Sequence, residues 1–240
     1  MRGLWSGLVA ACLTLAAGAP SLAQKAGAIF DKPVSTRMFG KDDAPKVICT
    51  VYADGAVREV QDGPSAEKAM LLKGPNAACE AKAPTGAITL ETEGLYLLGR
   101  IGDHLVFSAL DPHGAVDFSV VDARSGKTVL TGGTHGTPEF KSARSAGSVT
   151  TLVYRRGINA PCSLANSGAR CWGSLVDDGK IPNSLARPAP NPSICAASYR
   201  KEKSPKDNPS IVSFDAETTI DAAGKVTTLA KGKVACDPMP

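Results

Sequence analysis

The sequence predicts an all-β fold of antiparallel meander sheets with one short helix and a long proline-rich loop. Three observations support this prediction. In residues 94–131, four short runs rich in β-branched and aromatic residues alternate with clusters of Gly, Asp, Pro and Ser, which is typical of consecutive antiparallel strands. Residues 46–60 have Asp-Gly between two β-prone runs, which predicts a hairpin. Residues 148–156 and 211–236 predict further strands. Sandwich, barrel and irregular propeller-like arrangements all remain open.

The first two runs of the central meander, 94–101 and 104–110, are expected to be covered on both faces, and the third to have one core face. Successive side chains of a strand point to opposite sides, so Val116, Phe118 and Val120 should share the core face of one run. The preceding run, 104–110, is apolar on both faces and should lie in the middle of the sheet. Gly126 occupies a turn that requires positive φ, and a bulky residue there should break the strand register.

One corner of the meander resembles a known repeat. Residues Val121–Val129 resemble the strand-turn-strand corner in the blades of β-propeller repeat proteins. Looser copies occur at 52–57, 177–180 and 221–226, but their spacing is irregular, whereas stacked repeats keep a fixed period. No family is therefore assigned.

The N-terminus is typical of a secretory signal peptide. Arg2 is followed by an apolar run and by the small residues Ser21 and Ala23, which predicts cleavage after residue 23. A membrane anchor and lipidation at Cys12 are weaker alternatives. We expect a periplasmic or secreted protein without a transmembrane segment in the mature chain.

Six cysteines remain after residue 23, and an even number in an exported chain favours disulfides. Local topology predicts three pairs: Cys49 with Cys79, Cys162 with Cys171, and Cys195 with Cys236. A zinc site is the alternative, but no pair has the Cys-x-x-Cys spacing that favours it. We expect neither a metal nor another cofactor.

The charge does not indicate a nucleic-acid partner. Removing residues 1–23 takes away one of 27 basic residues, Arg2, so the net charge falls from +4 to +3. A charge this small and evenly spread does not predict nucleic-acid binding.

Residues 46–240 are expected to form a single all-β domain after a flexible lead-in at 24–45. Good helix formers in Pro64–Leu72 predict the one short helix. Residues 171–176 are expected to be a strand. The prolines of 181–210 predict an extended excursion with a basic cluster near its end, which we expect to be a solvated loop more than a binding element.

Four residues are candidates for a binding site: His104, His113, His135 and Trp172. The histidines lie in or beside turns of the meander and were expected to converge at one end of the sheet, near Asp103 and Asp111. Loops on a rigid scaffold commonly carry recognition.

The sequence contains no convincing catalytic pattern. Ser65–Lys68 and Ser198–Lys201 fit Ser-x-x-Lys, but the companion motifs of penicillin-recognising enzymes do not occur. The glycine-rich stretch 132–138 does not fit a phosphate-binding loop. A carboxylate pair for glycoside hydrolysis stays open, with material among the acidic residues Glu91, Glu93, Asp103, Asp111 and Asp117. The sequence therefore favours an exported binding or structural module over an enzyme, and the alternative is a small secreted hydrolase with a His/Asp site.

Overall fold

The computed structural model describes residues 29–41, 45–62, 65–74, 79–80, 82–110, 114–136 and 140–239. The predicted signal peptide, Cys12, Asp111 and His113 lie outside these residues. In the described part of the chain, no helix is long and apolar enough to cross a membrane.

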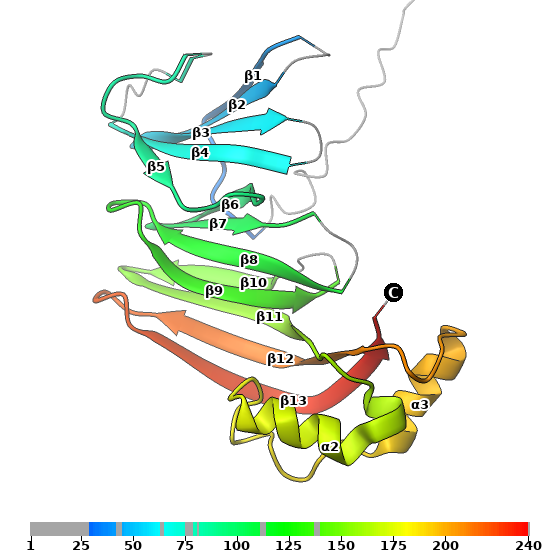
Figure 1. The fold of residues 1–240 in the computed structure, drawn as a ribbon. Coiled ribbons are helices and arrows are strands. Elements are labelled where there is room, and N and C mark those ends of the chain that lie inside the picture. The colour runs from blue at the N-terminus through cyan, green and yellow to red at the C-terminus, as the bar shows by residue number, and fades with distance from the viewer. Residues whose placement is uncertain are drawn as a thin grey trace, which may run out of the picture.

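The N-terminal half of the described chain forms a five-stranded antiparallel sheet in the order β1-β2-β3-β4-β5 (Figure 1). Its strands are β1 (Ser35–Phe39), β2 (Lys46–Tyr52), β3 (Gly55–Asp62), β4 (Ser65–Lys73) and β5 (Ile88–Leu90). The predicted hairpin at 46–60 is confirmed as β2 and β3, with Tyr52 paired to Gly55 across the turn.

The remaining strands form an eight-stranded antiparallel sheet in the order β13-β12-β11-β9-β8-β7-β6, and β10 pairs with β11. Its strands are β6 (Tyr96–Ile101), β7 (His104–Ser108), β8 (Ala115–Asp122), β9 (Thr128–His135), β10 (Phe140–Ala146), β11 (Val149–Asn159), β12 (Ser210–Ile220) and β13 (Val226–Pro238). β9 pairs with β11 at Thr134 and Arg156, which joins the meander β6–β9 to strands β11–β13.

The meander β6–β9 packs against other elements on both faces, and β7 is buried on both faces, as predicted. Leu105, Phe107 and Val121 point into a cluster shared with the five-stranded sheet. The opposite face carries Phe118 and Val120 into a second cluster, shared with β10–β13 and the helices. Burial of alternate side chains in two separate cores explains why β7 is apolar on both faces.

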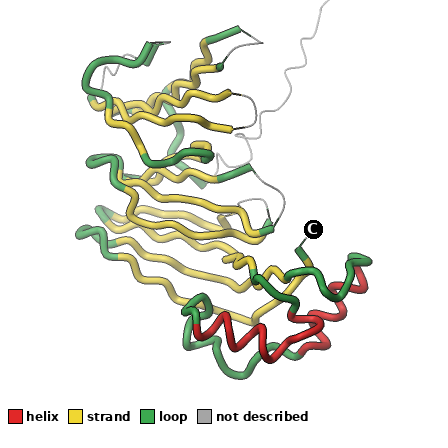
Figure 2. The backbone as a smooth tube through the Cα atoms, in the orientation of Figure 1, coloured by secondary structure: helices red, strands yellow, loops and turns green. Residues whose placement is uncertain are grey.

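Two helices lie at the end of the molecule remote from the five-stranded sheet, beside β13 (Figures 1 and 2). They are α2 (Leu164–Asp177) and α3 (Pro192–Lys201). The buried residues Leu164, Cys171, Trp172 and Leu175 join α2 to the core. Asn191 caps α3, accepting a hydrogen bond from the backbone N–H of Ser193.

The all-β antiparallel fold class is confirmed, but three local predictions are wrong. The predicted helix at Pro64–Leu72 is instead strand β4. The strand expected at 171–176 is part of α2, and the proline-rich excursion contains α3. In addition, the segment expected to be a flexible lead-in contains β1, which pairs with β2.

Candidate functional site

The two described histidines lie at opposite ends of the central meander. In the strand register, His104 faces Asp122, whereas His135 faces Ala115 at the other end of β8. Asp122 is seven positions after Ala115, which corresponds to roughly 23 Å of extended strand. The structure therefore does not bring His104 and His135 together, and His113 lies outside the described residues.

His104 has the environment of a structural residue. It is 4% exposed, and its Nδ1 lies 2.9 Å from Thr150 Oγ1, a contact that joins β7 to β11. Burial lowers the pKa of this imidazole, while Asp122 and Asp103 act in the opposite direction. A buried neutral histidine bonded to a threonine stabilises the packing of two strands.

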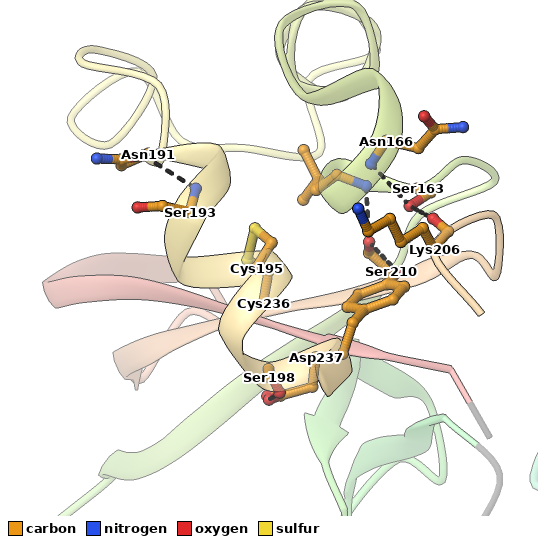
Figure 3. Close-up of a disulfide and its surroundings, with 12 residues drawn as sticks. Ser163, Asn166, Asn191, Ser193, Cys195, Ser198, Lys206, Ser210, Cys236 and Asp237 are labelled. Carbon is orange, nitrogen blue, oxygen red and sulfur yellow. Dashed lines mark hydrogen bonds between the residues drawn. A yellow bond between two sulfur atoms is a disulfide. The ribbon is translucent and has the colours of Figure 1, made fainter. Parts of the chain in front are cut away.

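His135 is paired with Asp237, which lies with Ser198 beside the Cys195–Cys236 disulfide (Figure 3). Its Nε2 lies 3.1 Å from Asp237 Oδ2, and Ser198 Oγ donates a hydrogen bond to Oδ1 of the same carboxylate. The hydrogen bond from His135 is the main cause of the lowered pKa of Asp237. Asp237 contacts both Ser198 and His135. The serine hydroxyl is therefore bonded to the aspartate, not to the histidine, whereas a histidine contact is what activates a serine nucleophile. The cluster anchors α3 to the ends of β9 and β13.

Trp172 is also structural. It lies in α2, is 3% exposed, and donates a hydrogen bond from Nε1 to the carbonyl of Ala186 at 2.9 Å. The indole is therefore enclosed and is not available to a ligand at the sheet surface.

All three predicted disulfides are present in the structure: Cys49–Cys79, Cys162–Cys171 and Cys195–Cys236. The first lies in a buried cluster on the outer side of the five-stranded sheet. The second links Cys171, in the middle of α2, to the chain just before the helix, and the third links α3 to β13.

An open groove of about 520 Å³ lies between the chain that follows β5 and the β8–β9 hairpin. Its lining residues are Glu91, Thr92, Glu93, Leu95, Asp117, Phe118, Ser119, Thr131 and Gly132. Three of these carry carboxylates and three carry hydroxyl groups. Among the described residues that line the groove there is no Lys, Arg or His.

One wall of the groove is a turn held in place by backbone hydrogen bonds. Leu95 N donates to Thr92 O at 2.9 Å, which closes the turn. Gly94 has φ +78°, a conformation that favours glycine at this turn position. Its N–H donates to Ala66 O on β4 at 2.9 Å. The turn therefore presents Glu91 and Glu93 from a fixed backbone.

The opposite wall is the solvent-facing end of β8 and β9. Ser119 pairs with Thr131 in the register, and Asp117 lies two residues from Ser119 on the same face. The side chains of Asp117 and Thr131 are exposed, whereas Ser119 is 6% exposed. Hydroxyl and carboxylate groups therefore lie side by side along this wall.

Thr92 has an unusual position between the two glutamates. Its side chain is 2% exposed, and Oγ1 has no hydrogen-bond partner among the described residues. A buried hydroxyl without a partner is destabilising, and Thr92 is one of the residues that line the groove.

A second hollow is much smaller, about 30 Å³, and lies beside Tyr52. Arg100, which lines it, is ion-paired with Asp54 and lies over the Tyr52 ring at 5.4 Å. The volume of this hollow is about that of one water molecule, which is too small for an organic ligand. The described residues also contain no group of three or more His, Cys, Asp or Glu side chains that could hold a metal ion.

The candidate site in the structure is therefore the groove, and the two described histidines and Trp172 do not line it. Glu91, Glu93 and Asp117 were among the acidic residues that the sequence offered without a pattern, and the groove brings them together. The sequence analysis missed Thr92, Ser119 and Thr131. A usable signal was the polar face of 117–119, opposite the core residues Val116, Phe118 and Val120.

The geometry of the groove cannot be compared with that of a relative, because no protein-family model, curated protein or solved structure matches this chain.

Proposed function

We propose that this chain is an exported binding module that is cleaved after residue 23 and holds its ligand in the groove between residues 91–95 and the β8–β9 hairpin. The observation that carries the proposal is the groove itself, a hollow of about 520 Å³ with polar groups on both walls. That volume falls within the range of typical ligand sites. The anchored turn and the paired strands keep both walls in place before a ligand arrives, which lowers the entropic cost of binding.

The disulfides support export. Every cysteine after residue 23 is bonded to another, and such frameworks persist in oxidising compartments and are rare in the cytosol. The signal-like pattern of residues 1–23 is consistent with this location.

Binding is favoured over hydrolysis. Glu91, Glu93 and Asp117 are all exposed, whereas the acid of a glycosidase is normally enclosed by apolar groups that keep it protonated. The cluster of Ser198, Asp237 and His135 places the aspartate in the middle, without the serine–histidine contact of a hydrolase.

Export is tested by expressing the full chain in a Gram-negative host and recovering the protein from the periplasm. Intact-mass analysis should give a chain that begins at Gln24 and has no free thiols. A cytosolic, uncleaved or fully reduced product contradicts the exported part of the proposal.

Binding is tested by screening the mature protein against a mixed library of sugars, amines, short peptides and carboxylic acids, with amide chemical shifts as the readout. Hits should perturb the amides of residues 91–95, 117–119 and 131–132. If the hits perturb only other regions, or if the library yields none, the groove is not the binding site.

A further inference from the structure

The charge of the groove is opposite to the charge of the molecule. The chain as a whole has a net charge of +4, yet the groove is lined by Glu91, Glu93 and Asp117 without a basic residue among its described lining. A net-positive protein repels cations in general, so any attraction for a cation must be local to such a place. The groove therefore differs from a typical solvated surface of mixed charge.

The carboxylates are distributed over both walls. Glu91 and Glu93 project from the turn after β5, and Asp117 belongs to β8. A single small ion would require ligands that converge on one point. Charges placed on separate walls instead suit a ligand with several separate positive groups.

The hydroxyl groups supply the complementary hydrogen bonds. Ser119 and Thr131 lie opposite each other in the register, and Thr92 has a buried Oγ1 without a partner in the described chain. Ammonium and guanidinium groups are donors only, and peptide groups both donate and accept. Carboxylates and hydroxyls together can satisfy both kinds of group.

We propose that the groove binds an extended peptide segment that carries at least two lysine or arginine side chains. The inference rests on the proposed function and specifies its ligand. A peptide is favoured over a compact small molecule because the groove is open, so a chain can enter and leave it, and because its walls offer hydroxyl partners for peptide groups as well as carboxylates for side chains.

The test uses a fluorescein-labelled tetralysine peptide and the mature, oxidised protein, with fluorescence anisotropy at low ionic strength. The triple variant Glu91→Gln, Glu93→Gln, Asp117→Asn should weaken binding by about tenfold, because each exposed charge pair contributes a factor of a few. Binding should also weaken as salt is added.

The matched control removes the same charge elsewhere. Asp62, Asp178 and Glu202 are exposed and do not line the groove. The variant Asp62→Asn, Asp178→Asn, Glu202→Gln should bind tetralysine as the unaltered protein does. Equal weakening in both triple variants would show a general charge effect and would overturn the inference.

Two further probes separate the inference from the proposed function. Labelled tetraglutamine should bind at least tenfold more weakly than tetralysine. If tetraglutamine or a sugar binds in the groove and tetralysine does not, the basic-peptide inference fails while the binding function stands. If spermidine binds in the groove and tetralysine does not, the ligand is a free amine and the peptide inference is again overturned.

Discussion

At the scale of single residues, the least ordinary group is the carboxyl of Glu59 on β3. It is 3% exposed, and its Oε1 accepts a hydrogen bond at 2.8 Å from the backbone N–H of Leu97, which joins the five-stranded sheet to β6. Burial raises its pKa from an ordinary value of 4.5 to about 7, although the hydrogen bond from Leu97 acts in the opposite direction.

This carboxyl should make stability depend on pH. Its folded pKa lies above its unfolded value, so its stabilising contribution is complete below pH 4.5 and is lost as the pH rises through about 7. A shift of this size corresponds to about 3 kcal/mol. Gln at position 59 keeps an acceptor for Leu97 and cannot ionise. We expect Glu59→Gln to be more stable than the unaltered protein at pH 8 and nearly equal at pH 4.5, as measured by urea unfolding. A constant difference between the two pH values would contradict this.

Gly126 is required both by its backbone and by its neighbours. Its φ is +75°, and a Cβ there would lie 2.7 Å from Cγ2 of Ile88 and 3.2 Å from Cδ2 of Leu90. Gly224 has a similar φ of +79° but no atom within 4 Å of a Cβ, so it is a matched control for the backbone effect alone. We expect Gly224→Ala to cost about 1 kcal/mol and Gly126→Ala at least about 1 kcal/mol more, because of crowding. Urea unfolding measures the free energy lost in each variant. Equal losses would mean that the side chains of β5 move aside without a further cost in stability.

The position of the candidate site could not be predicted from the individual residues. Sequence alone identified acidic residues at 91, 93 and 117, but Asp117 comes 24 residues after Glu93 in the chain. Their proximity follows from the packing of one sheet against another, and no short-range pattern encodes that packing. The histidines were misplaced for a related reason: His104 and His135 both adjoin turns, but a meander puts successive turns at alternate ends.

At the scale of elements, the strands and the disulfides were predictable because both leave local signals. Alternation and turn residues mark strands, and pairing cysteines by local topology gave the three observed bonds. Strand β4 was missed because helix propensity is a weak preference. Its pairing with β3 and β5, and the burial of Ala69 and Leu71, override that preference.

The two helices were not predicted because their sequences contain proline and glycine, which have low helix propensity. Pro192 lies at the start of α3, where the missing N–H costs nothing, and Asn191 caps it, so a proline marked a helix where it was taken to exclude one. In α2, weak helix formers such as Gly168 and Gly173 concealed a helical spacing of the buried Leu164, Cys171 and Leu175.

The disulfide that joins α3 to β13 should contribute more stability than the one at α2. Cys195 and Cys236 are 41 residues apart, whereas Cys162 and Cys171 are 9 apart. The larger loop restricts the unfolded chain more, by about 4 kcal/mol against about 2.5 kcal/mol in the chain-entropy account. We therefore expect Cys195→Ala, Cys236→Ala to lower the free energy of unfolding more than Cys162→Ala, Cys171→Ala does.

Hydrogen exchange separates this loss from a general loosening. Amides of residues 192–201 should exchange faster than the rest of the helical end when the Cys195–Cys236 bond is removed, and they should stay protected when the Cys162–Cys171 bond is removed. Equal exchange of α3 in both variants would mean that Ser198, Asp237 and the helix packing hold α3 without the disulfide.

At the scale of the whole molecule, the central meander connects two hydrophobic cores. Its one face packs on the five-stranded sheet and its other face packs on β10–β13 and the helices. Hydrogen bonds and an ion pair cross between the first sheet and the meander at Glu59, Asp54 and Ala66. The groove lies where the turn after β5 meets β8 and β9, so its shape depends on this packing.

A layered arrangement of this kind should unfold as one unit, and Trp172 can report it. It is the only tryptophan after residue 23 and lies in α2, at the far end from the five-stranded sheet (Figure 1). Leu71, on β4, is 5% exposed in the core between that sheet and the meander. Leu71→Ala should cost about 2 to 5 kcal/mol, and the loss should lower the urea midpoint of Trp172 fluorescence although the two residues are in different cores. Leu229→Ala, at a site 55% exposed, is the control and should change the free energy of unfolding by no more than about 0.5 kcal/mol. If Leu71→Ala lowers a circular-dichroism midpoint but not the Trp172 midpoint, the five-stranded sheet unfolds independently, and a ligand in the groove would then stabilise the contact between two separate units.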